Sequence, residues 1–163
     1  MKKIFPFLII LGFAITACSP TKNLDEFYAK YDKRATVIPL PAFAVNLAKK
    51  KTDAKILEYV KSAKVFVISN AGKGKQNRVM KDLASATKGE NYDQMVKLKV
   101  KRNNLNASYF ENDGKINKLI LGVNGLKNVL VIDSKVDLTK EQLEHALEDI
   151  DLSDLEELTD ILK

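Results

Sequence analysis

Cysteine and histidine, which are common nucleophiles and metal ligands, are scarce in this 163-residue chain. It contains one Cys, Cys18, one His, His145, and no Trp. A single Cys excludes a disulfide framework within the chain and a cysteine-rich zinc site, and a single His excludes the HExxH zinc helix. Glu141, His145 and Glu148 have the i, i+4, i+7 spacing of one helix face. A histidine among surface carboxylates is usually only solvated, so we expect no metal site.

The segment Ala71–Lys75 (AGKGK) invites comparison with a phosphate-binding loop, because it follows an expected strand and precedes an expected helix. The loop pattern GxxxxGK[ST] requires Ser or Thr after the lysine. Here Gly74-Lys75 is followed by Gln76, and the first glycine of the pattern is also missing. We therefore expect a plain turn. A weak anion site on its free amides, assisted by its lysines and Arg78, is the alternative.

Cys18 follows an apolar segment at the N-terminus. Lys2 and Lys3 precede 13 almost wholly apolar residues, Ile4–Thr16, whereas a membrane-spanning helix needs about 20. A positive start, a short apolar run and small residues at its end are typical of a secretory signal peptide. Residues 1–17 are therefore predicted to be a signal peptide.

The four residues Ile15–Cys18 (ITAC) resemble the bacterial lipobox. The resemblance implies that the Cys18 thiol receives a diacylglyceryl group, that a peptidase cuts after Ala17, and that the new amino group is acylated. No other cofactor is expected. Each buried methylene contributes about 0.8 kcal/mol, so two or three acyl chains make a stable anchor. Ser19 follows the cysteine, which by resemblance to enterobacterial sorting favours the outer membrane, facing the periplasm.

The charge of the remaining chain is divided unevenly. Residues 18–134 contain 22 Lys and Arg against 11 Asp and Glu, whereas residues 135–163 contain 3 against 10. We predict a tether at 18–22, one domain at 23–150, and an acidic C-terminal helix or tail at 151–163. Docking of this acidic tail on the basic body of the same or another chain, as self-association, is one interpretation.

Hydrophobic periodicity and turn residues predict an α+β fold. Asn112-Asp113-Gly114 and Asn124-Gly125 carry tight-hairpin signals and predict a C-terminal three-stranded antiparallel meander. We expect a mostly antiparallel sheet with the helices packed on one face. The predicted strands are 36–40, at an edge, 64–69, 105–110, 115–123 and 128–134. The predicted helices are 23–33, 41–50, 53–62, 75–87, a short one near 92–96, 139–150 and one from 153. Residues 97–101 are assigned to a loop, and the alternation there suggests a strand with one polar face as the alternative.

Two basic clusters are candidate anion-binding surfaces. They are solvated surfaces in the simplest interpretation, and in the functional one they contact anionic lipid headgroups or an anionic envelope polymer. A Lys or Arg beside an anionic membrane contributes on the order of 1 kcal/mol. The predicted export argues against a nucleic-acid partner. The clusters are Lys49, Lys50 and Lys51, and Lys97, Lys99, Lys101 and Arg102.

Four stretches resemble, in order and spacing, small bacterial lipoproteins that share the domain of unknown function 4252. The resemblance covers roughly residues 24–150, and it carries no assigned activity and no catalytic residues. The segment 153–163 is expected to extend beyond the family pattern. The stretches are LDEFYAKYDKRATVIPLPAF, KVFVISN, YDQMVKLKVKRNNLNASYFENDGKINKLILGV and NVLVIDSKVDLTKEQLEHAL.

Together these features predict a lipid-anchored envelope protein with a non-catalytic binding or scaffolding role. Its expected partners are membrane lipid, through Cys18, and an anionic envelope polymer or another envelope protein. The alternative is an envelope hydrolase with paired carboxylates. The chain has no GxSxG turn, but two carboxylates from distant segments could still converge in a cleft.

Overall fold

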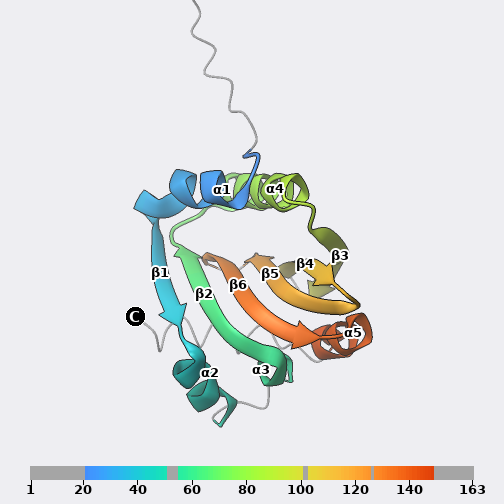
Figure 1. The fold of residues 1–163 in the computed structure, drawn as a ribbon. Helices are drawn as coiled ribbons and strands as arrows, with labels where there is room; N and C mark the ends of the chain where they lie inside the picture. Colours follow the sequence, from blue (N-terminus) through green and yellow to red (C-terminus); the bar gives the residue numbers. More distant parts are fainter. Residues whose placement is uncertain (1–20, 51–54, 101–102, 126, 149–163) are drawn as a thin grey trace, which may run out of the picture.

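The computed structural model describes residues 21–50, 55–100, 103–125 and 127–148; Cys18 and residues 149–163 lie outside this range. Six strands form one sheet in the order β1-β2-β6-β5-β4-β3, and every neighbouring pair is antiparallel. The predicted α+β class and the meander of β4, β5 and β6 are confirmed (Figure 1). In chain order the elements are α1 (Leu24–Tyr31), the 3-10 turn η1 (Asp32–Arg34), β1 (Ala35–Leu40), α2 (Ala42–Lys49), α3 (Ile56–Tyr59), β2 (Val60–Ile68), α4 (Lys73–Gly89), β3 (Asp93–Val100), β4 (Asn103–Asn112), β5 (Lys115–Asn124), β6 (Val129–Leu138) and α5 (Lys140–Glu148).

The turn between β4 and β5 forms for the reason that the sequence indicated. Asp113 and Gly114 have φ values of 53° and 74°, and a tight hairpin needs positive φ at both central positions. Gly125, at the next turn, has a φ of 101°. The register that follows pairs Asn112 with Lys115 across the first turn, which confirms the hairpin.

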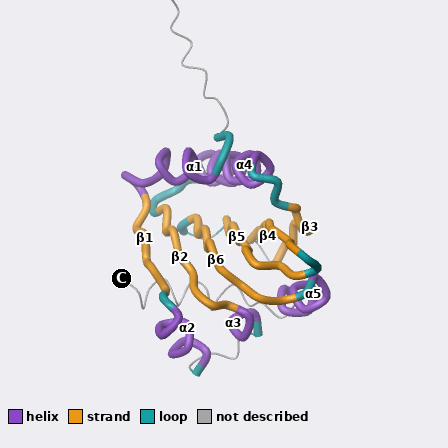
Figure 2. Tube along the Cα trace, viewed as in Figure 1, coloured by secondary structure: helices purple, strands orange, loops and turns teal. Residues whose placement is uncertain are grey.

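The sheet separates two hydrophobic cores, and helices cover both of its faces (Figures 1 and 2). Val65 and Val67 of β2 belong to the core under α2, α3 and α5. Phe66 and Ile68 belong to the core under α1 and α4. The helices were expected on one face only. That expectation was wrong because the central strands are apolar on both faces, so each face has to be covered.

Strand replaces one predicted helix and part of another. The short helix near 92–96 is part of β3, because the alternation that continues through 97–101 suits pairing with β4. Of the helix predicted at 53–62, residues 53 and 54 lie outside the described part, Ile56–Tyr59 form α3, and from Val60 onward the chain extends as β2. Val60 pairs with Val136 of β6, so the sheet contacts override the local helical pattern. Within the residues that the structure describes, no helix is long and apolar enough to cross a membrane.

The predicted helix starts are confirmed at both ends of the domain. The Thr139 hydroxyl accepts from the Gln142 backbone N–H at 3.3 Å, and the Gln142 side chain accepts from the Thr139 N–H at 2.8 Å, which is a capping box. The Asn23 side chain accepts from the Glu26 N–H at 2.8 Å. The Glu26 carboxylate, however, accepts from the Lys22 N–H at 2.8 Å, so this helix start also fixes the residue before it.

Candidate functional site

Helix α4 organises the surface where polar groups gather. Its apolar side, which includes Val79, Met80 and Leu83, packs into the core beneath α1 and α4. Gly122 of β5 allows this close approach. A Cβ at Gly122 would lie 2.7 Å from the Met80 Cε atom and 2.8 Å from a Leu83 methyl, closer than packed carbon atoms come. The missing side chain therefore sets how near α4 sits to the sheet.

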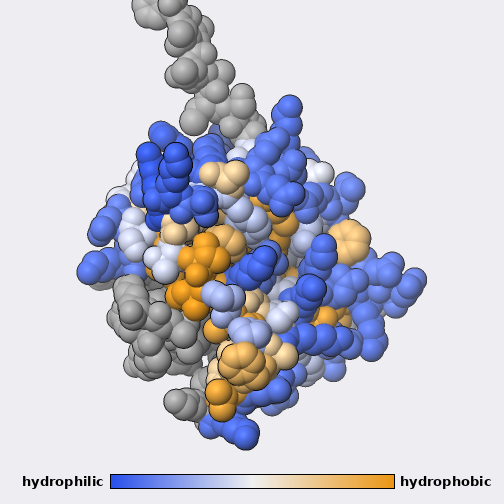
Figure 3. All heavy atoms as spheres, turned by 60° about the vertical axis from the view of Figure 1, so that its left-hand side comes forward, coloured by the Kyte–Doolittle hydropathy of each residue, from blue (hydrophilic) through white to orange (hydrophobic). Residues whose placement is uncertain are grey.

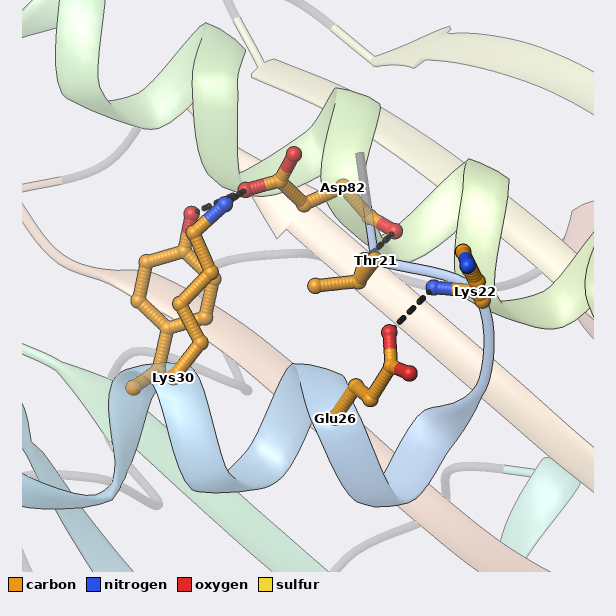
Figure 4. A network of polar contacts seen from close by, with 6 residues as sticks. Thr21, Lys22, Glu26, Lys30 and Asp82 are labelled. Atoms are coloured by element: carbon orange, nitrogen blue, oxygen red, sulfur yellow. Dashed lines mark hydrogen bonds and ion pairs between the residues drawn. The ribbon is translucent and has the colours of Figure 1, made fainter. Parts of the chain in front are cut away.

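The chain enters the domain along α4. The buried Thr21 hydroxyl donates to the Asp82 carbonyl oxygen at 2.7 Å (Figure 4). The Lys22 backbone passes directly over Gly89, where a Cβ would overlap the Lys22 carbonyl. Thr21 and Lys22 were assigned to the tether at 18–22, and the structure shows them packed against the helix. The remaining tether residues lie outside the described part of the chain.

The Asp82 carboxylate joins α1 to α4. Asp82 is 5% exposed. Its Oδ2 atom accepts from the Tyr31 hydroxyl at 2.6 Å and from the Lys30 ammonium at 2.7 Å (Figure 4). A buried carboxylate needs such donors, because burying an unpaired charge costs several kcal/mol. The three side chains therefore hold the two helices in one relative position.

A second polar contact ties α1 to the sheet. The Tyr28 hydroxyl donates to Asp133 Oδ2 at 2.9 Å, and the Tyr28 ring stacks on Phe66 with centroids 4.3 Å apart. Burial, and then the negative charge of Asp133, hold the pKa of Tyr28 well above its usual range. Burial, followed by Asp133 and Glu90, raises the pKa of Tyr92 to about 12. Both phenols therefore stay protonated at neutral pH and cannot act as bases.

A groove of about 370 Å³ opens between α4 and the strands β3 and β4. Met80, Leu83 and Met95 form its apolar part. Its hydrogen-bonding groups are three amides, one ammonium and one hydroxyl. The amides belong to Asn77, Gln94 and Asn106, the ammonium to Lys81 and the hydroxyl to Ser108.

Three of these polar side chains are available to a ligand. Asn77, Lys81 and Asn106 make no hydrogen bond or ion pair with the described part of the chain. Gln94 donates to the Ala84 carbonyl at 3.3 Å, and Ser108 donates to the Thr87 hydroxyl at 3.4 Å. Unpaired polar groups that converge on a concave surface with an apolar wall are typical of a binding site.

The groove does not contain the paired carboxylates that the hydrolase alternative requires. Its lining residues supply amides, a hydroxyl and an ammonium, and none of them is Asp or Glu. Among the described residues, the buried and half-buried carboxylates lie elsewhere: Asp82 between α1 and α4, Asp133 beneath Tyr28, and Glu90, which accepts from the Leu24 backbone N–H at 2.7 Å.

The outward side of α4 is strongly basic. Arg78, Lys81 and Lys88 are exposed and, with the half-buried Ser85, follow the i, i+3, i+7, i+10 spacing of one stripe along the helix. We call Arg78, Lys81 and Lys88 the basic stripe. The one acidic residue of α4, Asp82, is buried and paired. This stripe was not predicted from the sequence, although its helical spacing was a usable signal.

The structure separates the two predicted basic clusters. Lys49 and Lys50 belong to α2 and its end, which packs on β1 and β2, and the Lys49 ammonium donates to the Glu58 carbonyl at 3.3 Å. Lys97 and Lys99 belong to β3, the opposite edge of the sheet; their side chains, like Lys51, Lys101 and Arg102, lie outside the described part. The clusters therefore do not form one surface.

The glycine-rich turn is held together by the residue that breaks the phosphate-loop pattern. Gln76 is buried, and its side chain donates to the Ala71 carbonyl at 2.7 Å and accepts from the Gly125 N–H at 2.8 Å. A Ser or Thr at this position would be too short to make both contacts. The turn therefore has a structural explanation that involves no phosphate.

The histidine on α5 lies in an open position. His145 Nδ1 is 3.8 Å from Glu148 Oε2, and both side chains are largely exposed. Hydrogen bonds to its own backbone N–H and to Thr139 lower the pKa of Glu141. Among the described residues, no three His, Cys, Asp or Glu side chains are grouped so that they could hold a metal ion.

Apolar side chains are exposed on α2 and on the edge strand β1. Phe43 and Leu47, one turn apart on α2, are 70% and 57% exposed, and Val37 of β1 is 39% exposed. Figure 3 shows orange side chains at the surface formed by β1 and α2. We call Phe43 and Leu47 the apolar patch; Val37 pairs with Phe66 of β2 and lies on the opposite face, that of α1 and α4.

These features define an α+β domain whose antiparallel sheet carries helices on both faces, with a polar groove beside its longest helix. Residues 28–146 match the profile of a family described as Domain of unknown function (DUF4252), so the chain belongs to this family, as the resemblance predicted. No curated protein and no solved structure matches the chain.

Proposed function

We propose that this protein is a lipid-anchored lipoprotein of the bacterial envelope with a non-catalytic binding role. In this proposal residues 1–17 are removed as a signal peptide and Cys18 carries the lipid. The domain faces the periplasm from the outer membrane. The observation that carries the anchor is the position of the chain's one Cys directly after the short apolar run.

The entry of the chain into the domain supports a close attachment. Thr21 is already fixed against α4, and three residue steps from Cys18 to Thr21 span at most about 11 Å. The domain is therefore held near the bilayer instead of hanging on a long linker.

The groove beside α4 supports the binding role. It offers Asn77, Asn106 and Lys81 without partners in the described chain. Amides both donate and accept hydrogen bonds, and an ammonium favours an acidic group. A glycan that carries carboxylates fits this combination, and it is an anionic envelope polymer of the kind that the sequence predicted.

The anchor is tested with Cys18→Ser in a bacterial expression host. We expect the wild type to sediment with membranes and to have the intact mass of a chain that begins at an acylated Cys18. The variant should stay in the soluble envelope fraction. An unmodified chain that begins at Met1 would contradict the anchor, and so would equal membrane association of the variant.

The groove is tested by titration calorimetry with soluble peptidoglycan fragments, which carry carboxylates, and with neutral chitin oligosaccharides. We expect the acidic fragments to bind more tightly, and Lys81→Ala and Asn106→Ala each to weaken binding about tenfold, the loss of about one charged or amide contact. The control is Asn46→Ala, an exposed amide on α2. Absence of binding by the wild type, or equal losses in the control, would refute the groove as the site.

A further inference from the structure

We propose that the basic stripe of α4 binds anionic phospholipid headgroups and turns the domain so that α1 and α4 face the bilayer. This inference takes its setting from the proposed anchor at Cys18, but the surface can be tested without it. The stripe consists of Arg78, Lys81 and Lys88, all exposed; Lys81 also lines the groove, so lipid and glycan would compete for this one ammonium.

The chain enters the domain beside the helix that carries the basic stripe. Thr21 and Lys22 lie on α4, and in Figure 1 this first described segment rises on the outer side of the layer formed by α1 and α4. An anchor at Cys18 would place the bilayer within about 11 Å of Thr21. The layer formed by α1 and α4 is therefore the part of the described domain that this anchor would bring nearest to the headgroups.

The outward side of α4 carries only positive charge. The basic stripe runs along more than two turns of α4, and the helix has no exposed carboxylate, because Asp82 points inward to Lys30 and Tyr31. The neighbouring helix α1 exposes Asp25 and Glu26, so the attraction to anionic lipid belongs to α4. A stripe of one sign beside a surface of the opposite sign is favoured until salt screens it.

In this orientation the surface around α2, on the other side of the sheet, does not contact the bilayer. Lys49 and Lys50 lie with the apolar patch on the side of the sheet away from α1 and α4. With the basic stripe on the bilayer, these residues point away from it. The cluster that the sequence suggested for headgroup contact therefore becomes a control for the one that the structure suggests.

The test uses the chain from residue 18 with Cys18→Ser, which keeps every described residue and carries no lipid. Binding to vesicles of phosphatidylcholine with phosphatidylglycerol is measured by co-sedimentation and compared with pure phosphatidylcholine. A basic residue near such a surface strengthens binding about fivefold. The triple variant Arg78→Gln, Lys81→Gln, Lys88→Gln should therefore bind the anionic vesicles about a hundredfold more weakly, and raised salt should weaken the wild type.

The matched control is the triple variant Lys49→Gln, Lys50→Gln, Lys140→Gln, which removes the same charge from α2 and α5 on the other side of the sheet. We expect the affinity of this variant for the anionic vesicles to fall at most a few-fold. Circular dichroism should show that both triple variants are folded. Equal losses in the two triple variants would show attraction by net charge alone and refute the inference. Unchanged binding of the stripe variant, or equal binding to uncharged vesicles, would also refute it.

The orientation is measured separately with a fluorophore at a single new cysteine. The variant background has no other thiol, so Ala29→Cys on α1 and Asn46→Cys on α2, both exposed, can each be labelled alone. Brominated lipids in anionic vesicles should quench the label at 29 more than the label at 46. Stronger quenching at 46 would refute the orientation. Because no lipid anchor is present, these results are independent of whether Cys18 is modified in cells.

Discussion

The two faces of the sheet are held by different kinds of contact. On the face of α1 and α4, side-chain hydrogen bonds join helix to helix and helix to strand, through Asp82 and through the pair of Tyr28 and Asp133. On the face of α2, α3 and α5, the described helices meet the sheet through apolar side chains such as Val45, Ile56 and Leu143. Apolar contacts stabilise without fixing direction, whereas hydrogen bonds with two defined partners fix a position. The first face is therefore the better suited to present groups in a fixed arrangement.

The largest expected effect comes from Asp82→Ala. The change removes the carboxylate that accepts from the Tyr31 hydroxyl and from the Lys30 ammonium. Because the Lys30 side chain is 30% exposed, the cost should be near the lower end for a broken buried pair, about 3 kcal/mol. Urea denaturation at neutral pH measures this change in the free energy of unfolding.

The control for Asp82→Ala is Asp137, another carboxylate that accepts hydrogen bonds from two donors. Asp137 accepts from Lys61 at 2.9 Å and from Lys115 at 3.2 Å, but it is largely exposed. These lysines lower the pKa of Asp137, so its small contribution is present at neutral pH and is lost as the pH falls through the lowered pKa. Asp137→Ala should change stability far less than Asp82→Ala. Equal losses would contradict the contrast between buried and exposed contacts.

Gly89→Ala tests the fixation of the entering chain. A methyl group at this position collides with the Lys22 carbonyl, so Thr21 and Lys22 have to leave α4 and lose their hydrogen bonds. We expect a loss of about 2 kcal/mol and faster hydrogen exchange at the Lys22 amide. Gly74→Ala, in the same helix with no atom near its added Cβ, should be neutral or stabilising. Unchanged exchange in Gly89→Ala would be evidence against a fixed entry.

Tyr28→Phe tests the contact between α1 and β6. Loss of the hydrogen bond to Asp133 should cost about 1 kcal/mol at neutral pH. The raised pKa values of Tyr28 and Tyr92 mean that the folded state keeps its phenol protons longer than the unfolded state. Stability is therefore full below pH 10.0 and falls as the pH rises from there toward about 12. The fall should be shallower in Tyr28→Phe, as urea denaturation at a series of alkaline pH values will show; an identical slope would argue against the coupling.

The smallest effect on stability is expected at the apolar patch. Phe43→Ser and Leu47→Ser alter side chains that are largely exposed, so each should change the free energy of unfolding by less than about 0.5 kcal/mol. Val45→Ala, on the same helix but 2% exposed, should cost about 2 kcal/mol. Thermal denaturation of the three variants gives the comparison. A large loss in Phe43→Ser would mean that the patch contributes to the fold.

The fold was predictable where a local signal decides the local structure. Asp113-Gly114 specified its hairpin because few other residue pairs tolerate positive φ at both positions. Thr139 and Gln142 specified a helix start in the same way. The prediction failed at Val60 and at residues 92–96, where pairing with β6 and β4 decides the conformation. The placement of helices on both faces also depended on which strands became neighbours, and no local signal reports that.

The candidate site was less predictable than the fold. The groove joins Asn77 and Lys81 of α4 to Gln94 of β3 and Asn106 of β4, residues that only the folded chain brings together. The anion-binding clusters predicted from the sequence were runs of neighbouring lysines such as Lys49–Lys51. The residues of the basic stripe are instead spaced by helical turns, with other residues between them in the sequence. A search for charges at helical spacing would have found it.

The fixation of Thr21 determines how a mechanical load would enter the molecule. A pull on the N-terminal end would first strain the contacts of Thr21 and Lys22 with α4 and α1, and only then strain the strands. Those contacts lie on the outer helices, and β1 follows α1 at an edge of the sheet. Tension would therefore reach the four inner strands, β2, β6, β5 and β4, only through these outer elements.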